Sequence, residues 1–150
     1  MTNKKNQQIS IGGAIVFKDS RGKKYFLLVK TKEGGDWEIP KITVRRGESS
    51  VRSVIRMTSE QGGISTKVLE EVGRYTSSAV INGKSVSQKH YYYLMIQKGG
   101  PSEMIGFYSF KWFASKDIMK KLTSKKEKEM FKMSRGVLKE WEAKHKAQII

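Results

Sequence analysis

The chain has 150 residues, of which 37% are hydrophobic and 10% aromatic, and it contains no cysteine. This composition fits one folded domain with a real core and excludes a disordered chain, a disulfide framework and a thiolate metal site. Thirty Lys and Arg against 14 Asp and Glu give a net charge of +16. Such a charge favours polyanionic partners, although a lysine-rich surface can also serve solubility alone.

The polar segment 1–8 predicts a flexible N-terminal tail, and residues 9–150 predict a single domain. No apolar run approaches the roughly 20 residues needed to span a bilayer, and the N-terminus lacks the apolar core of a signal peptide. A cytoplasmic protein is therefore expected. Residues 9–17 and 24–30 are β-branched and aromatic and flank a turn-rich stretch, which predicts a β-hairpin.

A helix is predicted from about Ser49 to Gln61. Ser49 can serve as its N-cap, Val54 and Thr58 fall on one apolar stripe, and the paired glycines at 62–63 end it. Ahead of this helix, Pro40 should hold the preceding residue extended.

The second half of the chain predicts more strands and then helices. The expected elements are a strand at 67–78, a hairpin at 79–86 with a type I′ turn at Asn82-Gly83, strands at 89–97 and 106–113, and helices at 115–122 and 124–146. The order strands, helix, strands, helix predicts an α+β fold, an α/β/α sandwich around a mixed β-sheet with a basic C-terminal helix.

The segment from Trp37 to Ile64 resembles the Nudix family signature, G-x5-E-x7-R-E-U-x-E-E-x-G-U, in which U is a bulky aliphatic residue. The usual W-x-L-P lead-in appears here as WEIP, beginning at Trp37. The positions that match the signature are Glu48, Arg56, Glu60, Gly63 and Ile64. The resemblance implies a Nudix-like fold, with Glu48, Arg56 and Gly63 as structural residues and Arg56 holding Glu60.

The departures from the signature concern its metal ligands. Ile42 replaces the opening Gly, Met57 replaces the Glu after the Arg, and Gln61 replaces the second Glu of the pair. In family members those two carboxylates are the main Mg²⁺ or Mn²⁺ ligands. A thioether is a poor Mg²⁺ ligand and a neutral amide adds no charge. The resemblance therefore implies a degenerate, catalytically impaired member with no bound metal and no other cofactor.

The same segment is basic, with five cations and two anions between Lys41 and Gly62. An arginine fork can bind phosphate oxygens directly, without a bridging metal. We therefore expect a phosphate-binding surface formed by Lys41, Arg45, Arg46 and Arg52.

Three further residues could contact such a ligand. Trp37 and Tyr91 could stack on bases or simply pack in the core, and His90 could contact a phosphate. Along the predicted strand, Tyr91 and Tyr93 should share one face while Tyr92 points to the other.

A working enzyme is the alternative, a Mg²⁺-dependent hydrolase of a nucleoside-diphosphate derivative such as a dinucleoside polyphosphate or capped RNA. Glu60 would then need help from a loop carboxylate, and Glu103 is the candidate, with Glu70 and Glu71 behind it. An ordinary exposed loop acid is the other interpretation of Glu103.

The C-terminal region 111–146 carries twelve basic and five acidic residues. It could lie along a nucleic-acid backbone, or it could be a solvated face with ion pairs such as those of Glu127. RNA is favoured over a membrane surface, because Leu138 and Trp141 are expected in the core. RNA is thus the expected partner, and a structural subunit of a ribonucleoprotein is a further alternative.

Overall fold

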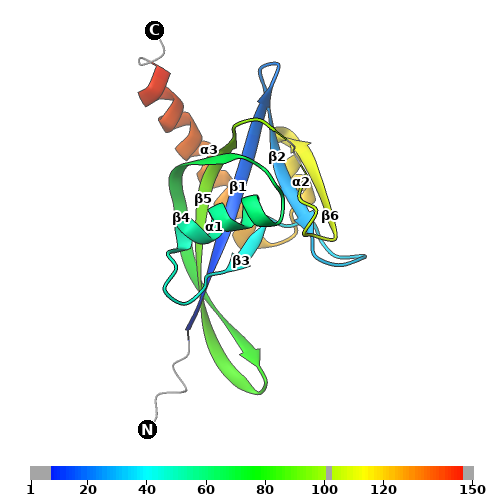
Figure 1. Cartoon of the computed structure of the whole chain (residues 1–150), viewed down its shortest axis with the longest axis vertical. Coiled ribbons are helices and arrows are strands. Elements are labelled where there is room, and N and C mark those ends of the chain that lie inside the picture. Colours follow the sequence, from blue (N-terminus) through cyan, green and yellow to red (C-terminus); the bar gives the residue numbers. More distant parts are fainter. Residues whose placement is uncertain (1–7, 101–102, 147–150) are drawn as a thin grey trace.

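A computed structural model of the chain describes residues 8–100 and 103–146 (Figure 1). The predicted N-terminal tail lies outside the described residues except for Gln8, which opens the first strand. In chain order the elements are β1 (Gln8–Ser20), β2 (Lys23–Lys30), β3 (Lys41–Thr43), α1 (Ser50–Glu60), β4 (Thr66–Ile81), β5 (Lys84–Gln97), β6 (Ser109–Ala114), α2 (Ser115–Lys121) and α3 (Lys125–Lys146). Within the described ranges, no helix is long and apolar enough to cross a membrane.

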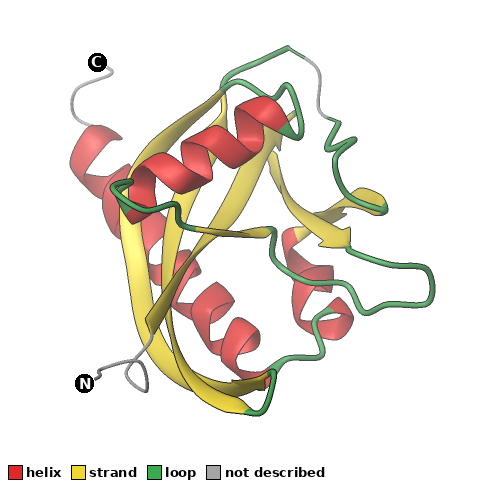
Figure 2. Cartoon of the chain, turned by 60° about the horizontal axis from the view of Figure 1, so that its bottom comes forward, coloured by secondary structure: helices red, strands yellow, loops and turns green. Residues whose placement is uncertain are grey.

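The six strands form one mixed sheet in the order β4-β5-β1-β2-β6, with β3 also paired to β1. The β1–β5 pair is parallel and the other pairs are antiparallel. Helices lie on both sides of the strands, α1 on one and α2 with α3 on the other (Figure 2). The predicted α/β/α sandwich with a mixed sheet is confirmed.

Two apolar clusters fill the space between the sheet and its helices. The first includes Tyr92 from β5 and Phe131 from α3. The second includes Tyr93 from the same strand and Met57 from α1. The alternation expected for the tyrosines is confirmed, because neighbouring side chains on a strand point to opposite faces.

The glycine pair at the centre of β1 brings both layers close to the sheet. A Cβ atom at Gly12 would collide with Ser53 of α1, and one at Gly13 would collide with the ring of Tyr92. Gly12 and Gly13 therefore allow β1 to lie close to α1 on one face of the sheet and close to the Tyr92 ring on the other.

The second half of the sheet differs from its prediction in how the strands join. β4 and β5 form one long hairpin, where a separate strand, a short hairpin and another strand were predicted. The turn itself is confirmed, since Asn82 and Gly83 have the positive φ values of 52° and 75° that a type I′ turn requires. The hairpin tip projects beyond the other elements in Figure 1.

Candidate functional site

The helix α1 begins and ends as its sequence predicts. The Ser49 side chain accepts a hydrogen bond from the Arg52 amide at 3.2 Å and caps the N-terminus. After the last turn, Gly63 has a φ of 59°, a left-handed conformation that lets the chain leave the helix at little cost. The segment that resembles the Nudix signature is therefore a loop followed by a capped helix.

One ion pair fixes the loop to the middle of this helix. The Arg56 guanidinium donates two hydrogen bonds to the Glu48 carboxylate, at 2.9 and 3.0 Å, and a third to the Thr43 carbonyl oxygen at 3.1 Å. The Arg45 amide also donates to Glu48 at 3.0 Å. These hydrogen bonds, those from Arg56 above all, lower the pKa of Glu48 to about 2. The structural role predicted for Glu48 and Arg56 is consistent with this geometry.

The expected pairing of Arg56 with Glu60 was wrong. Arg56 is occupied by Glu48, while Glu60 is exposed and forms no ion pair within the described part of the chain. The two residues lie four positions apart on α1, but the fork geometry of the guanidinium favours the loop carboxylate, which it meets with two parallel bonds.

The two positions where the resemblance places the main metal ligands carry a methionine and a glutamine. The Met57 side chain is 0% exposed and packs in the core with Val54 and Ile64. Gln61 is half-buried and uncharged, which leaves Glu60 as the one carboxylate of this group. Among the described residues, no three His, Cys, Asp or Glu side chains are placed to hold a metal ion. The residues present therefore do not fit Mg²⁺.

The loop that carries Glu103 packs against the end of α1. The Gly106 amide donates to the Gln61 carbonyl oxygen at 2.7 Å. Gly62 permits this approach, because a Cβ atom there would lie 3.0 Å from the Glu103 carbonyl oxygen. The Glu103 residue itself is exposed. The loop thus brings one further carboxylate to the same end of the helix as Glu60.

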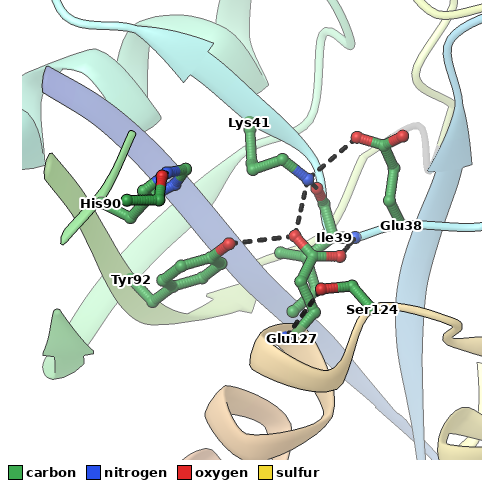
Figure 3. Close-up of polar contacts among 8 residues, drawn as sticks. Glu38, Ile39, Lys41, His90, Tyr92, Ser124 and Glu127 are labelled. Carbon is green, nitrogen blue, oxygen red and sulfur yellow. Dashed lines mark hydrogen bonds and ion pairs between the residues drawn. The ribbon is translucent and has the colours of Figure 1, made fainter. Parts of the chain in front are cut away.

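A buried carboxylate, absent from the predicted site, lies on the other face of the sheet (Figure 3). Glu127 of α3 is 3% exposed and accepts hydrogen bonds from the Ile39 amide at 2.9 Å, the Lys41 ammonium at 2.6 Å and the Tyr92 hydroxyl at 3.0 Å. Lys41 also donates to Glu38 at 2.9 Å. Glu127 therefore joins α3 to the segment before α1 and to β5.

This cluster corrects the predictions for Lys41 and Glu127. Burial opposes the charge on Lys41, yet the attraction and hydrogen bonds of Glu127 and Glu38 raise its pKa above the usual value. Its ammonium is thus already paired with two carboxylates, and Lys41 is not part of an open phosphate-binding surface. Glu127 is not part of a solvated helix face, because its side chain points into the protein.

His90 is buried, so the expectation that it contacts a phosphate was wrong. Its ring stacks on Tyr75 with centroids 4.3 Å apart, and its Nε2 atom lies 3.2 Å from the Ser77 hydroxyl. Its Nδ1 atom is buried and has no hydrogen-bond partner among the described residues. Burial, with a smaller contribution from the Lys41 ammonium, lowers the pKa of His90, and the Glu127 carboxylate partly opposes this.

Acidification should therefore destabilise the protein through His90. Because the folded state lowers the pKa of His90, the unfolded chain binds the proton more readily below about pH 6.5. We expect the free energy of unfolding, measured by urea denaturation, to fall as the pH drops from 7 toward 5.5. His90→Phe should flatten this dependence, whereas His145→Gln should leave it in place. An unchanged slope in His90→Phe would show that other groups cause it.

Both aromatic candidates lie beneath cations. Tyr91 is half-buried, with Arg74 at 5.1 Å and Lys89 at 5.8 Å from its ring centroid. Trp37 is also half-buried, and the Lys30 ammonium lies 4.7 Å from its ring. These contacts place both rings at the protein surface, but neither ring is fully open to a base.

The predicted arginines lie at the surface around α1. Arg45, Arg46 and Arg52 are exposed and form no ion pair within the described residues. Arg52 also lines an open hollow of about 540 Å³ on the outer side of α1, together with Ile55 and the paired Arg56. Of the five cations of this segment, these three remain able to bind an anion.

Comparisons with known proteins bear on the fold. The sequence matches no protein-family model and no curated protein. Among solved structures, the C. elegans Ap4A hydrolase is similar with a TM-score of 0.66 and 21% identity, over 88% of this chain and 99% of that one. The NUDIX domain of Shewanella oneidensis NrtR, complexed with ADP ribose, gives a TM-score of 0.66 at 16% identity, over 89% and 90% of the two chains. The chain has the Nudix fold.

A second structure of NrtR shows the same likeness in a longer chain. Shewanella oneidensis NrtR complexed with a 27mer DNA has a TM-score of 0.62 and 17% identity, over 85% of this chain and 61% of that one. The Nudix fold thus occurs in a hydrolase and in a protein that was crystallised with nucleic acid. At these identities the comparisons establish the fold predicted from the sequence.

Proposed function

We propose that this Nudix-fold protein binds RNA through an arginine- and lysine-rich surface and is catalytically impaired as a hydrolase. The observation that carries the proposal is the burial of Met57, which is 0% exposed where the resemblance places a metal-binding glutamate. A hard divalent cation needs several charged oxygens to replace its water. On α1 only Glu60 could supply one.

The free arginines support direct phosphate binding. Arg45, Arg46 and Arg52 are exposed without ion pairs in the described residues, and a guanidinium can meet a phosphate with two parallel hydrogen bonds. The net charge of +16 exceeds what a single nucleotide needs and suits a long polyanion. Assembly into a ribonucleoprotein would be one setting for such binding.

Removing two of these arginines should weaken RNA binding. In Arg45→Ser/Arg46→Ser, we expect the Kd for a fluorescein-labelled single-stranded RNA to rise several-fold, because two phosphate contacts are lost. The slope of log Kd against log salt should also decrease by roughly 0.7 for each contact. Fluorescence anisotropy at a series of KCl concentrations measures both quantities.

Arg74→Ser is a control that removes one charge, because its guanidinium is already paired with Glu71 at 2.7 Å. We expect it to change the Kd and the salt slope less than the double variant does. A native protein that does not bind the RNA would contradict the proposed function. Equal effects of both variants would contradict the role of Arg45 and Arg46 in it.

Hydrolysis is the second candidate, favoured by the loop that brings Glu103 to the end of α1 that carries Glu60. Two carboxylates would give a weak site compared with the larger sets that hard cations prefer. Phosphate release from dinucleoside polyphosphates and capped RNA, with Mg²⁺ or Mn²⁺, tests this candidate. Metal-dependent turnover that Glu103→Gln abolishes would replace our proposal.

A further inference from the structure

Two segments that are distant in sequence meet at one corner of the fold. Residues 23–32 and 111–121 together carry eight lysines and one acidic residue, Asp117. Antiparallel pairing of β2 with β6 joins them, with Leu28 opposite Lys111. Figure 1 shows β2, β6 and α2 together at one side of the sheet. The helix α3, which is of similar length, carries eight basic and four acidic residues, so this corner has the denser positive charge.

Three of these lysines gather around a pair of aromatic rings. The Lys30 ammonium lies 4.7 Å from the ring centroid of Trp37. Trp37 meets Phe113 edge to face, with centroids 5.2 Å apart. The ammonium groups of Lys111 and Lys121 lie 5.3 and 5.6 Å from the Phe113 ring. We call Lys30, Lys111 and Lys121 the lysine triad.

No carboxylate neutralises the lysine triad within the described residues. The structure contains ion pairs elsewhere, for example between Lys24 and Glu142 at 3.0 Å, but none involves the triad. Glu33 and Asp36 are exposed in the loop before Trp37 and form no ion pair with it. Attraction to the aromatic rings holds each ammonium in place and leaves its N–H groups available to an acceptor.

A second group of lysines extends the corner toward the start of α2. Lys23 and Lys116 line an open hollow of about 440 Å³ beside Tyr25. Lys24 also lines it, although its ammonium is shared with Asp19 and Glu142. Lysines outside the triad therefore also lie along β2 and at the start of α2.

We infer that the lysine triad is the main contact for the phosphate backbone of a bound RNA strand. This inference rests on the proposed function and assigns it to a surface outside the segment that resembles the Nudix signature. Lysine binds phosphate as a point charge, which suits contacts that do not depend on base sequence. Because Lys30 covers the Trp37 ring, the contact is with phosphates, and base stacking on that face of the ring is not part of it.

The test compares two triple variants that remove the same charge. The first is Lys30→Gln/Lys111→Gln/Lys121→Gln. The second replaces Lys125, Lys132 and Lys139, which are exposed on α3, with Gln. Anisotropy with labelled single-stranded RNA at a series of KCl concentrations gives the Kd and the salt slope for both. Thermal unfolding confirms that each variant is folded.

We expect the triad variant to raise the Kd about tenfold and to reduce the salt slope by about 2, as the loss of three phosphate contacts predicts. The α3 variant should change the Kd less than about threefold. Equal losses in both variants would overturn the inference, because only total charge would matter. Native-like binding by the triad variant would overturn it as well while leaving the proposed function intact. If the native protein itself binds no RNA, the proposed function fails and the inference fails with it.

Discussion

Lys41→Met should lower the free energy of unfolding by about 3–5 kcal/mol, because it leaves a buried carboxylate without its cation. Glu127 is 3% exposed, and its 2.6 Å contact with Lys41 provides its neutralising charge. The hydrogen bonds from Ile39 and Tyr92 would remain, but neither donor is charged. Urea denaturation followed by tryptophan fluorescence measures the loss.

A double variant that removes both charges of the Lys41–Glu127 pair separates the electrostatic cost of Lys41→Met from the cost of lost packing. In Lys41→Met/Glu127→Gln, the glutamine oxygen can still accept from the Ile39 amide, the glutamine side-chain amide can donate to the Tyr92 hydroxyl, and no charge is buried. We therefore expect the double variant to be more stable than Lys41→Met alone, with a coupling of about 1–3 kcal/mol. Lys89→Met is the matched control, since Lys89 is half-buried without an ion pair in the described residues. A double variant no better than the single one would show that the ion pair contributes little.

Local signals in the sequence predict local structure well. The N-cap at Ser49 and the Asn82-Gly83 turn were predicted because capping and positive φ depend on a few neighbouring residues. The long β4–β5 hairpin was divided into shorter pieces because polar residues interrupt its apolar alternation at 76–78. Pairing with β5 stabilises these polar residues within β4. The sequence of β4 alone does not indicate that pairing.

The buried carboxylate shows why the candidate site was harder to predict. Ser124 and Glu127 have the spacing of a capping box, and the Glu127 amide does donate to the Ser124 hydroxyl at 3.2 Å. The Glu127 side chain, however, reaches Ile39 and Lys41, which are more than 80 positions away in the sequence. The spacing indicates a helix start, but it cannot indicate a partner on another element.

The clustering of positive charge also depends on contacts between segments that are distant in the sequence. Lys30 and Lys111 stand in different strands, and only the register of β2 against β6 brings them to one corner. Counted along the sequence, the positive charge favoured the C-terminal region as a whole. In the folded protein, part of the positive charge of that region is paired with carboxylates, as Lys126 is with Glu129 of the same helix. The lysine triad is not paired with a carboxylate in the described residues. For this reason we assign the main RNA contact to it.

Met57→Glu should destabilise the protein by about 3 kcal/mol or more, and it should not create an enzyme. Met57 is 0% exposed among apolar side chains, so a glutamate there would bury a charge with no partner in the described residues. Ile55→Glu adds the same charge to the exposed side of α1, where Ile55 is 44% exposed. It should change the free energy of unfolding by no more than about 0.5 kcal/mol.

The double variant Met57→Glu/Gln61→Glu decides whether this core position is a lost metal site. If the backbone still holds the geometry of a metal site, Mg²⁺ should raise the Tm of the double variant, because a ligand that binds only the folded state stabilises it. We expect no such rise and no phosphate release from nucleoside-diphosphate compounds, since the side chain at position 57 points into the apolar core. A Tm that increases with Mg²⁺, together with turnover, would show that two substitutions alone separate this protein from a hydrolase.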